Sequence, residues 1–240
     1  MIENQPAAHM GCAVACSGAL SAGVAHPSPP VPPLIVVGSG TVMIHGMPAA
    51  RWAPAPDFSA CGTVLGDPKL AIGRTVFIGG PSSLTVSIAN LDALLQAKLD
   101  AINEWDAPAR ADFKKWFGRT DESSRQIVIR RIGKMQNLLK GYRDSNFRGA
   151  GTQNADGLFA FVDPADDTVV SVGNAWATAP LTGTDSQAGA LGHEMSHFRS
   201  VGGTDDHVYG ANPSKDLANS SPDRALDNAD NFEYYLEDAP

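Results

Sequence analysis

The 240-residue chain lacks several features that mark other classes of protein. It contains no run of eighteen apolar residues, so we expect no membrane-spanning segment. Its first residues, MIENQPAAHMG, lack the basic and apolar regions of a secretory signal, so we expect any export to use another route. The formal net charge of −8 argues against a general nucleic-acid-binding protein, which normally carries a basic patch.

Cysteine is scarce and is confined to one end of the chain. All three cysteines (Cys12, Cys16 and Cys61) precede residue 81, as do ten of the 17 prolines. The charged residues are balanced over 1–80, so the rest of the chain supplies the whole net charge. This contrast predicts two domains, 1–80 and 85–240, joined by a linker at 81–84. The second domain has no cysteine and cannot depend on internal disulfides.

The first 80 residues contain a short repeat. TVMIHG at 41–46 matches TVFIGG at 75–80, and each unit is typical of a short strand that runs into a turn. We therefore predict a compact all-β module with little helix. Such small modules often need a metal or disulfide clamp. His9, His26, His45 and Cys61 form a set that suits structural zinc, although scattered surface histidines and a buried cysteine would look the same in a sequence.

The succession PAAH, GSGTVMIHGMPAAR, ACG and GRTVFIGG, over residues 4–80, resembles the PAAR-repeat family. This resemblance implies a small β cone that sharpens the trimeric VgrG spike of type VI secretion systems. It also implies a zinc ion held by three histidines and one cysteine, which favours the four side chains named above. His45 lies where many relatives have glycine or asparagine, so Cys12 or Cys16 remains an alternative ligand.

Beyond residue 84 the pattern predicts an α+β domain that is mostly helical. Apolar residues recur at three- and four-residue steps over 91–102 and 127–139, which indicates two amphipathic helices. Residues 159–162 and 169–172 predict two strands separated by a turn at 163–167. A further helix should contain residues 189–198.

That helix carries the pattern HExxH at residues 193–197 (HEMSH). Residues four apart share a helix face, so His193 and His197 can reach one metal ion. Glu194 can then accept a proton from the attacking water, whose pKa zinc lowers to about 7. A pattern this short also occurs by chance, so its surroundings decide whether it marks a zinc hydrolase.

The segment that follows the helix supplies further ligands. A catalytic zinc site typically uses three protein ligands, and two histidines leave it one short. Residues 203–210 (GTDDHVYG) offer carboxylates, a histidine and a phenol. On ligand chemistry alone, His207 is an attractive third ligand.

HExxH followed by GTDDHVYG resembles the aspzincin signature, in which GTxDxxYG lies downstream, as in deuterolysin and the peptidyl-lysine metalloendopeptidases. The resemblance implies that Asp206 is the third ligand, that Asp205 and His207 are variable neighbours, and that Tyr209 donates to the oxyanion in the transition state. Residues 116–118 (WFG) and a closing helix at 222–235 extend the resemblance over about residues 85–236.

Together these features predict a type VI effector toxin with one catalytic and one structural zinc. It would be made in a bacterial cytoplasm, carried on the VgrG spike and exported into a target cell, where it would cleave a peptide or protein. The resemblance also implies a cognate immunity protein. Two alternatives remain, namely a hydrolase of peptidoglycan stem peptides with the same zinc site and a catalytically inert spike tip. A purely structural zinc in the second domain is disfavoured, because closed structural sites prefer thiolates.

Overall fold

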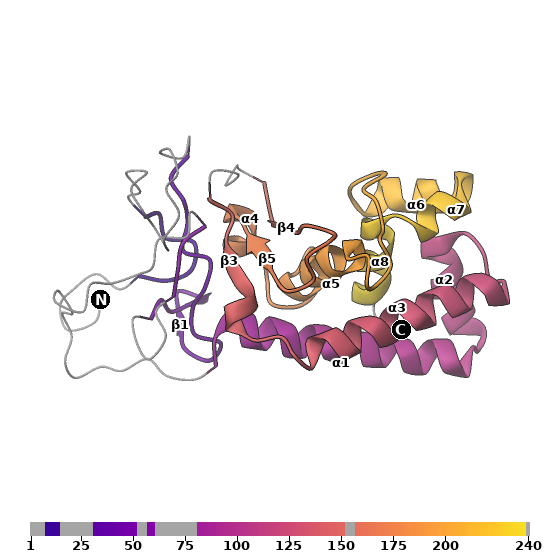
Figure 1. The fold of residues 1–240 in the computed structure, drawn as a ribbon, viewed down its shortest axis with the longest axis horizontal. Helices are drawn as coiled ribbons and strands as arrows, with labels where there is room; N and C mark the ends of the chain where they lie inside the picture. The colour runs from indigo at the N-terminus through magenta and orange to yellow at the C-terminus, as the bar shows by residue number, and fades with distance from the viewer. Residues whose placement is uncertain (1–7, 15–30, 52–56, 61–80, 152–156, 239–240) are drawn as a thin grey trace. The chain divides into compact units, whose positions relative to one another are not determined.

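A computed structural model describes residues 8–14, 31–51, 57–60, 81–151 and 157–238 (Figure 1). The chain forms two compact units, each built from segments that are distant in sequence. The first unit comprises Met1–Val86, Arg143–Phe161 and Val170–Ala179, and the second comprises Ser87–Tyr142, Val162–Val169 and Pro180–Pro240. These units do not follow the predicted division at 81–84, which remains a prediction about two functional domains.

A helix begins within the segment 81–84. Helix α1 (Ser83–Glu104) starts directly after Ser82, whose hydroxyl accepts a hydrogen bond from the Thr85 amide at 3.0 Å. This contact satisfies one of the free amides at the helix start, as capping serines do. Ser83 and Leu84 are fully buried at this helix start.

Strands in the first unit are short. β1 (Met43–Ile44) and β2 (Met47–Pro48) form an antiparallel hairpin. His45 and Gly46 both have positive φ, which suits a two-residue hairpin turn. The short strand that runs into a turn, predicted for 41–46, is therefore confirmed as β1 and the turn at His45 and Gly46, and its repeat at 75–80 lies outside the described residues. Isolated bridges join His9 to Ala49 and Ile35 to Ser59, whereas the predicted β cone stays a prediction.

A three-stranded sheet completes the first unit. β3 (Phe147–Gly149) follows a 3-10 turn (Asp144–Asn146) and pairs in parallel with β5 (Val170–Val172), which pairs antiparallel with β4 (Ala160–Phe161). The short helix α4 (Asn174–Thr178) comes next. The two strands predicted at 159–162 and 169–172 are confirmed as β4 and β5, whereas β3 was not anticipated.

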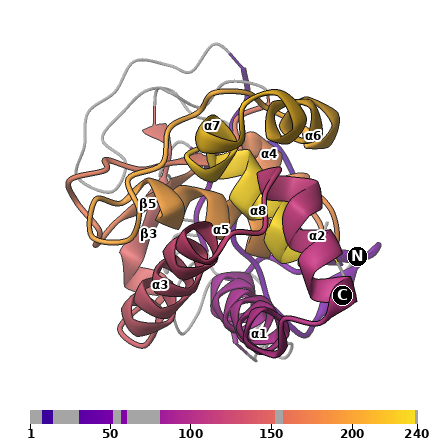
Figure 2. The ribbon, with the colours of Figure 1, turned by 90° about the vertical axis from the view of Figure 1, so that its right-hand side faces the viewer.

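The second unit is helical and contains most of α1. Both predicted amphipathic helices are confirmed, as α1 and as α3 (Glu122–Leu139), and most residues of their apolar stripes are buried. The two helices run side by side (Figure 2), and the side chain of Gln136 donates to that of Gln96 at 3.1 Å. Between them in sequence lies α2 (Ala107–Phe117). Within the described residues, no helix has both the length and the apolar character needed to cross a bilayer.

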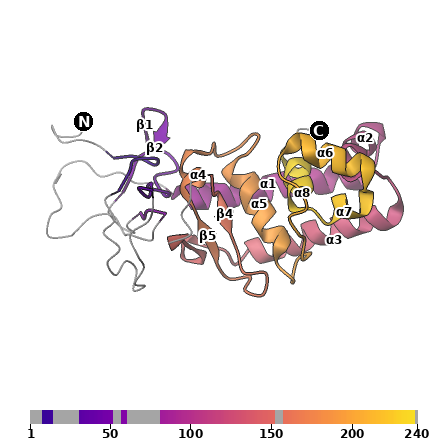
Figure 3. The ribbon, with the colours of Figure 1, turned by 90° about the horizontal axis from the view of Figure 1, so that it is seen from above.

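Four helices form the remainder of the second unit: α5 (Gln187–His197), α6 (Ala211–Ser220), α7 (Pro222–Leu226) and α8 (Ala229–Glu237). Helix α5 lies against α8 (Figure 3) and against α3. The single closing helix expected at 222–235 is broken into α7 and α8. The break coincides with a bridge between Asp205 and Asn228: the Asp227 carbonyl accepts the Asp205 amide at 2.8 Å, and Asn228 is extended.

Gly118 ends α2 and should tolerate no side chain. Its φ is +70°, and a Cβ there would lie 1.9 Å from the carbonyl oxygen of Ala218. We expect Gly118→Ala to lower the free energy of unfolding by roughly 2–4 kcal/mol through backbone strain and overpacking. Gly133→Ala is the control, because a Cβ at Gly133 in α3 meets nothing within 4 Å and alanine favours helix. Urea denaturation measures both, and equal stability of the two variants would contradict this.

Glu237 should make stability depend on pH. Burial raises its pKa from the usual 4.5 to about 7, although its carboxylate accepts the Ser186 amide at 2.8 Å at the start of α5. Between pH 4.5 and pH 7 the Glu237 carboxyl is protonated in the folded state and ionised in the unfolded state. Its contribution to stability is therefore fully present below pH 4.5 and is lost as the pH rises through 7. We expect a loss on the order of 2 kcal/mol, which Glu237→Gln removes. Thermal unfolding at pH 4.5 and 8 tests this, and parallel curves for both proteins would contradict it.

Candidate active site

The pair of histidines on α5 faces a carboxylate from the loop that follows. Nε2 of His193 lies 3.2 Å from Oδ1 of Asp206, and Nε2 of His197 lies 3.3 Å from the same oxygen. The three potential ligand atoms lie within 4.8 Å of one another. The structure thus brings together the two imidazoles and the carboxylate that the sequence proposed as a zinc site.

The outer nitrogens of both rings lie close to oxygen atoms as well. Nδ1 of His197 lies 2.7 Å from the Thr204 carbonyl oxygen, to which it can donate. Nδ1 of His193 lies 2.8 Å from Asp230 and 3.1 Å from Glu233, both on α8. Such outer contacts orient imidazoles and direct the other nitrogen toward a metal. Two nitrogens and one carboxylate oxygen, so arranged, are a donor set that fits catalytic zinc.

The site carries an excess of carboxylates. Burial alone would lower the pKa of His193, but Asp206, Asp230 and Glu233 outweigh burial and raise it. For Asp206 the two effects have the opposite signs: burial would raise its pKa, and the hydrogen bonds to His193 and His197 lower it. A positive charge is therefore strongly favoured among these groups, whether proton or metal ion.

Glu194 is buried beside the two histidines, only 6% exposed. Burial raises the pKa of its carboxyl, and the neighbouring imidazoles oppose this rise. A carboxylate with a raised pKa is suited to exchange a proton near neutral pH. Glu194 is absent from the group of ligand atoms within 4.8 Å, which suits a role in proton transfer.

Tyr209 lies at the open side of the site. Its ring is nearly parallel to that of His193, with centroids 6.5 Å apart, and the side chain is exposed. Partial burial and the Asp206 carboxylate raise the pKa of its phenol to about 12. The hydroxyl therefore stays protonated at neutral pH and can donate a hydrogen bond to a developing oxyanion.

Comparison with known proteins identifies the family. Residues 103–237 match the family described as lysine-specific metallo-endopeptidases, the aspzincins. The chain belongs to this family. The match lies within the helical half of the sequence, and the prediction of a zinc metalloendopeptidase is confirmed at the level of the family, as is a mostly helical zincin-like peptidase domain.

Three similar proteins come from two fungi and a bacterium. The chain is 38% identical over 128 residues to a peptidyl-Lys metalloendopeptidase of Pleurotus ostreatus. This alignment covers 53% of this chain and 74% of that protein. It is 41% identical over 129 residues to one of Grifola frondosa, of which it spans 36%. It is 36% identical over 135 residues to an extracellular protease of Aeromonas hydrophila, of which it spans 38%. These alignments cover 53% and 56% of this chain.

A solved structure, that of a zinc peptidase from Grifola frondosa, resembles this one. The TM-score is 0.57 at 34% sequence identity, over 65% of this chain and 92% of that chain. The similarity therefore extends from sequence to fold.

The loop at 203–210, which we call the aspzincin loop, is positioned by side chains that the sequence did not single out. The carbonyl oxygen of the Asn228 side chain accepts the amides of His207 at 2.8 Å and Val208 at 3.1 Å. Asp230 accepts the Gly210 amide at 2.5 Å, directly after Tyr209. The start of α8 thus fixes the segment that bears Asp206 and Tyr209. In the sequence, Asn228 and Asp230 belong to the segment NAD (228–230), which lies within the closing helix expected at 222–235.

His207 does not join the two histidines of α5. Its Nε2 lies 3.2 Å from Asp227, and its Nδ1 lies 3.3 Å from the Arg224 guanidinium. It forms a separate group with Asp205 and Asp227. This placement favours Asp206 over His207 as the third ligand.

The predicted N-terminal zinc site is only partly described. The rings of His9 and His45 lie 6.3 Å apart, and the Sγ of Cys12 accepts the His9 amide at 3.5 Å. His26, Cys61 and the alternative ligand Cys16 lie outside the described residues. Within the part that the structure describes, no group of three potential ligands includes His9, His45 or Cys12, so this zinc stays a prediction.

The aspzincin site has the parts needed for peptide hydrolysis. Zinc bound there would polarise the scissile carbonyl and make the attacking water more acidic. Glu194 can accept the proton of that water and pass it to the departing amine. Tyr209 can donate to the carbonyl oxygen as it gains charge.

Proposed function

We propose that this chain is a zinc endopeptidase that cleaves peptide bonds next to lysine. The observation that carries the proposal is the convergence of His193, His197 and Asp206 beside the buried Glu194. Membership of the aspzincin family supports the reaction. Relatives named peptidyl-Lys metalloendopeptidases support the substrate class.

The charge of the site supports a lysine-containing substrate. Asp230 and Glu233 are 5% and 7% exposed, and both place an oxygen near His193. Burial raises the pKa of Glu233, and its contact with His193 opposes this rise. An ammonium group that enters beside these carboxylates would gain charge-assisted hydrogen bonds.

A peptide-library digestion tests the reaction and the specificity together. Zinc-loaded protein should cut at lysine, and Glu194→Ala should not cut at all. We expect Glu233→Gln to lower kcat/KM for a lysine peptide about tenfold relative to the matched norleucine peptide, because a hydrogen bond to a charged group contributes about 1.5–3 kcal/mol. Cleavage without preference for lysine would refute the specificity. Release of stem peptides from cell-wall sacculi without any proteolysis would refute the protein substrate.

We also propose that the enzyme is a type VI effector, with residues 1–80 as a PAAR-like cap on the VgrG spike trimer. The support is the motif succession over residues 4–80. The cap would hold a second zinc through His9, His26, Cys61 and either His45 or Cys12 or Cys16. The protein would be made in the bacterial cytoplasm, exported by the type VI system and neutralised in the producer by an immunity protein.

Co-purification of the full chain with a VgrG trimer tests this delivery. We expect a stable complex that is lost when His9 and His26 are both replaced by alanine, with zinc content lowered by one equivalent. Competition between bacteria should then show killing that requires both the secretion system and Glu194. If the Glu194→Ala strain kills as well as wild type, peptidase activity has no part in killing, and the catalytically inert spike tip is the remaining interpretation.

A further inference from the structure

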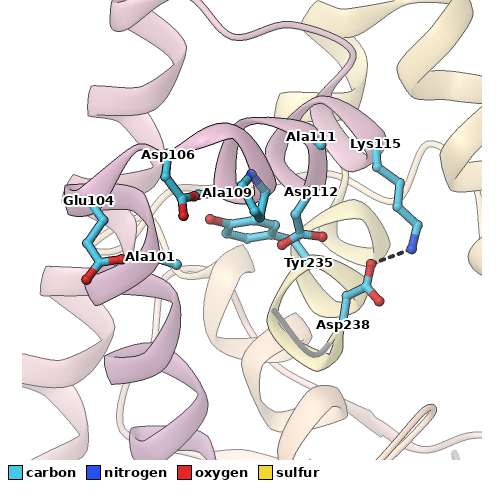
Figure 4. Close-up of a pocket in the computed structure, with 10 residues that line it drawn as sticks. Ala101, Glu104, Asp106, Ala109, Ala111, Asp112, Lys115, Tyr235 and Asp238 are labelled. Carbon is cyan, nitrogen blue, oxygen red and sulfur yellow. Dashed lines mark hydrogen bonds and ion pairs between the residues drawn. The ribbon is translucent and has the colours of Figure 1, made fainter.

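A second concave site lies within the helical unit, between the end of α1, helix α2 and the end of α8 (Figure 4). Its volume is about 530 Å³, which is within the usual range for small-ligand sites. Small alanine and proline side chains form part of the lining. The other six lining side chains are polar: Glu104, Asp106, Asp112, Lys115, Tyr235 and Asp238. None of these residues belongs to the candidate zinc site.

The pocket is acidic even after its internal ion pairs are counted. Asp112 is paired with the buried Lys98 at 2.6 Å, and Asp238 with Lys115 at 2.5 Å. Burial and a hydrogen bond to Asp238 raise the pKa of Asp112 above its usual value. Two carboxyl groups thus contact each other at one end, and Glu104 and Asp106 line the other. Four carboxylates against two ammonium groups leave an excess of negative charge.

Tyr235 supplies an observation independent of the carboxylates. The residue is only 2% exposed, and its ring packs against Phe113 and Phe117. Among the residues that the structure describes, none forms a hydrogen bond with its hydroxyl, which points across the pocket toward Asp106 (Figure 4). The hydroxyl is therefore available to form a hydrogen bond with a ligand in this pocket.

We propose that this pocket binds a primary ammonium group carried on an aliphatic stem. An ammonium offers three donors to Glu104, Asp106 and the Tyr235 hydroxyl, and such charge-assisted bonds are the strong ones. The alanine and proline side chains of the lining give the methylene stem an apolar wall. A lysine side chain and a free diamine share this chemistry. The site lies apart from the residues of hydrolysis, so binding does not depend on the proposed reaction.

Calorimetric titration of the full chain tests the proposal. The probes are Nα-acetyl-lysine amide, its neutral analogue Nα-acetyl-norleucine amide, and 1,5-diaminopentane. All titrations use the Glu233→Gln protein, which weakens competing binding at the zinc site. We expect the lysine amide to bind and the norleucine amide not to bind. Binding of the diamine alone would identify a free diamine as the ligand, and binding of the lysine amide would identify a side chain.

Two pocket variants, made in the same background, locate the binding. Tyr235→Phe should raise Kd about fivefold and leave the melting temperature unchanged, since the hydroxyl has no partner to lose. Glu104→Gln with Asp106→Asn should raise Kd at least tenfold, and asparagine keeps the cap of α2. Unchanged Kd in both variants, equal binding of the norleucine amide, or no binding of either amine at 10 mM would each overturn the proposal.

Discussion

Glu194→Gln should lower kcat on a lysine peptide about 10³-fold while zinc content stays unchanged. Glutamine keeps the size of the buried side chain and removes only its ability to exchange a proton. General acid–base catalysis contributes about 10²–10⁴-fold, and this carboxyl is placed beside both histidines with its pKa raised by burial. Initial rates with a quenched lysine peptide and zinc by atomic absorption measure the two quantities.

The control for this prediction is Glu122→Gln. Glu122 begins α3, is exposed and contacts Arg125 and Gln126 on its own helix. Its removal should leave kcat within about twofold, because exposed ion pairs contribute little. A Glu194→Gln enzyme that keeps more than a tenth of the wild-type kcat would show that another group moves the proton. Loss of zinc together with activity would assign Glu194 to metal binding.

The local parts of the fold could be predicted from the sequence. Apolar residues at helical spacing gave α1 and α3, because a stripe such as Leu91, Leu95 and Ile102 must be buried against something. The HExxH pattern gave α5 and the shared face of its histidines, since that geometry depends only on spacing within one helix. The resemblance of 203–210 to the aspzincin signature supplied Asp206.

Contacts between distant segments could not be predicted in the same way. Asp230 and Glu233 lie more than thirty residues beyond His193 and reach it only because α8 packs on α5. Asn228 looked like an interior residue of one helix, yet its side chain holds the loop of Tyr209 and it lies where the helix breaks. Periodicity reports which face of an element is buried, and carries no information on its partner.

Asp206→Ala should abolish stable zinc binding and with it the activity. Its Oδ1 lies within 3.3 Å of Nε2 in both His193 and His197, so the variant leaves two nitrogens where a catalytic site needs three protein ligands. Loss of a mere outer partner of a ligand costs roughly 10–100-fold in metal affinity. We therefore expect more than 100-fold weaker zinc binding, measured by competition with a fluorescent chelator, and an equivalent loss of kcat/KM at limiting zinc.

His207→Ala is the matched control, because it removes the neighbouring candidate ligand from the same loop. His207 contacts Asp227 and Arg224 and lies in a different group of side chains from His193 and His197. Its replacement should leave zinc affinity and kcat/KM within a few-fold of wild type, with the Asn228 contact to its backbone amide intact. The reverse result, with zinc lost in His207→Ala and retained in Asp206→Ala, would make His207 the third ligand. It would also mean that the loop closes differently once metal is bound.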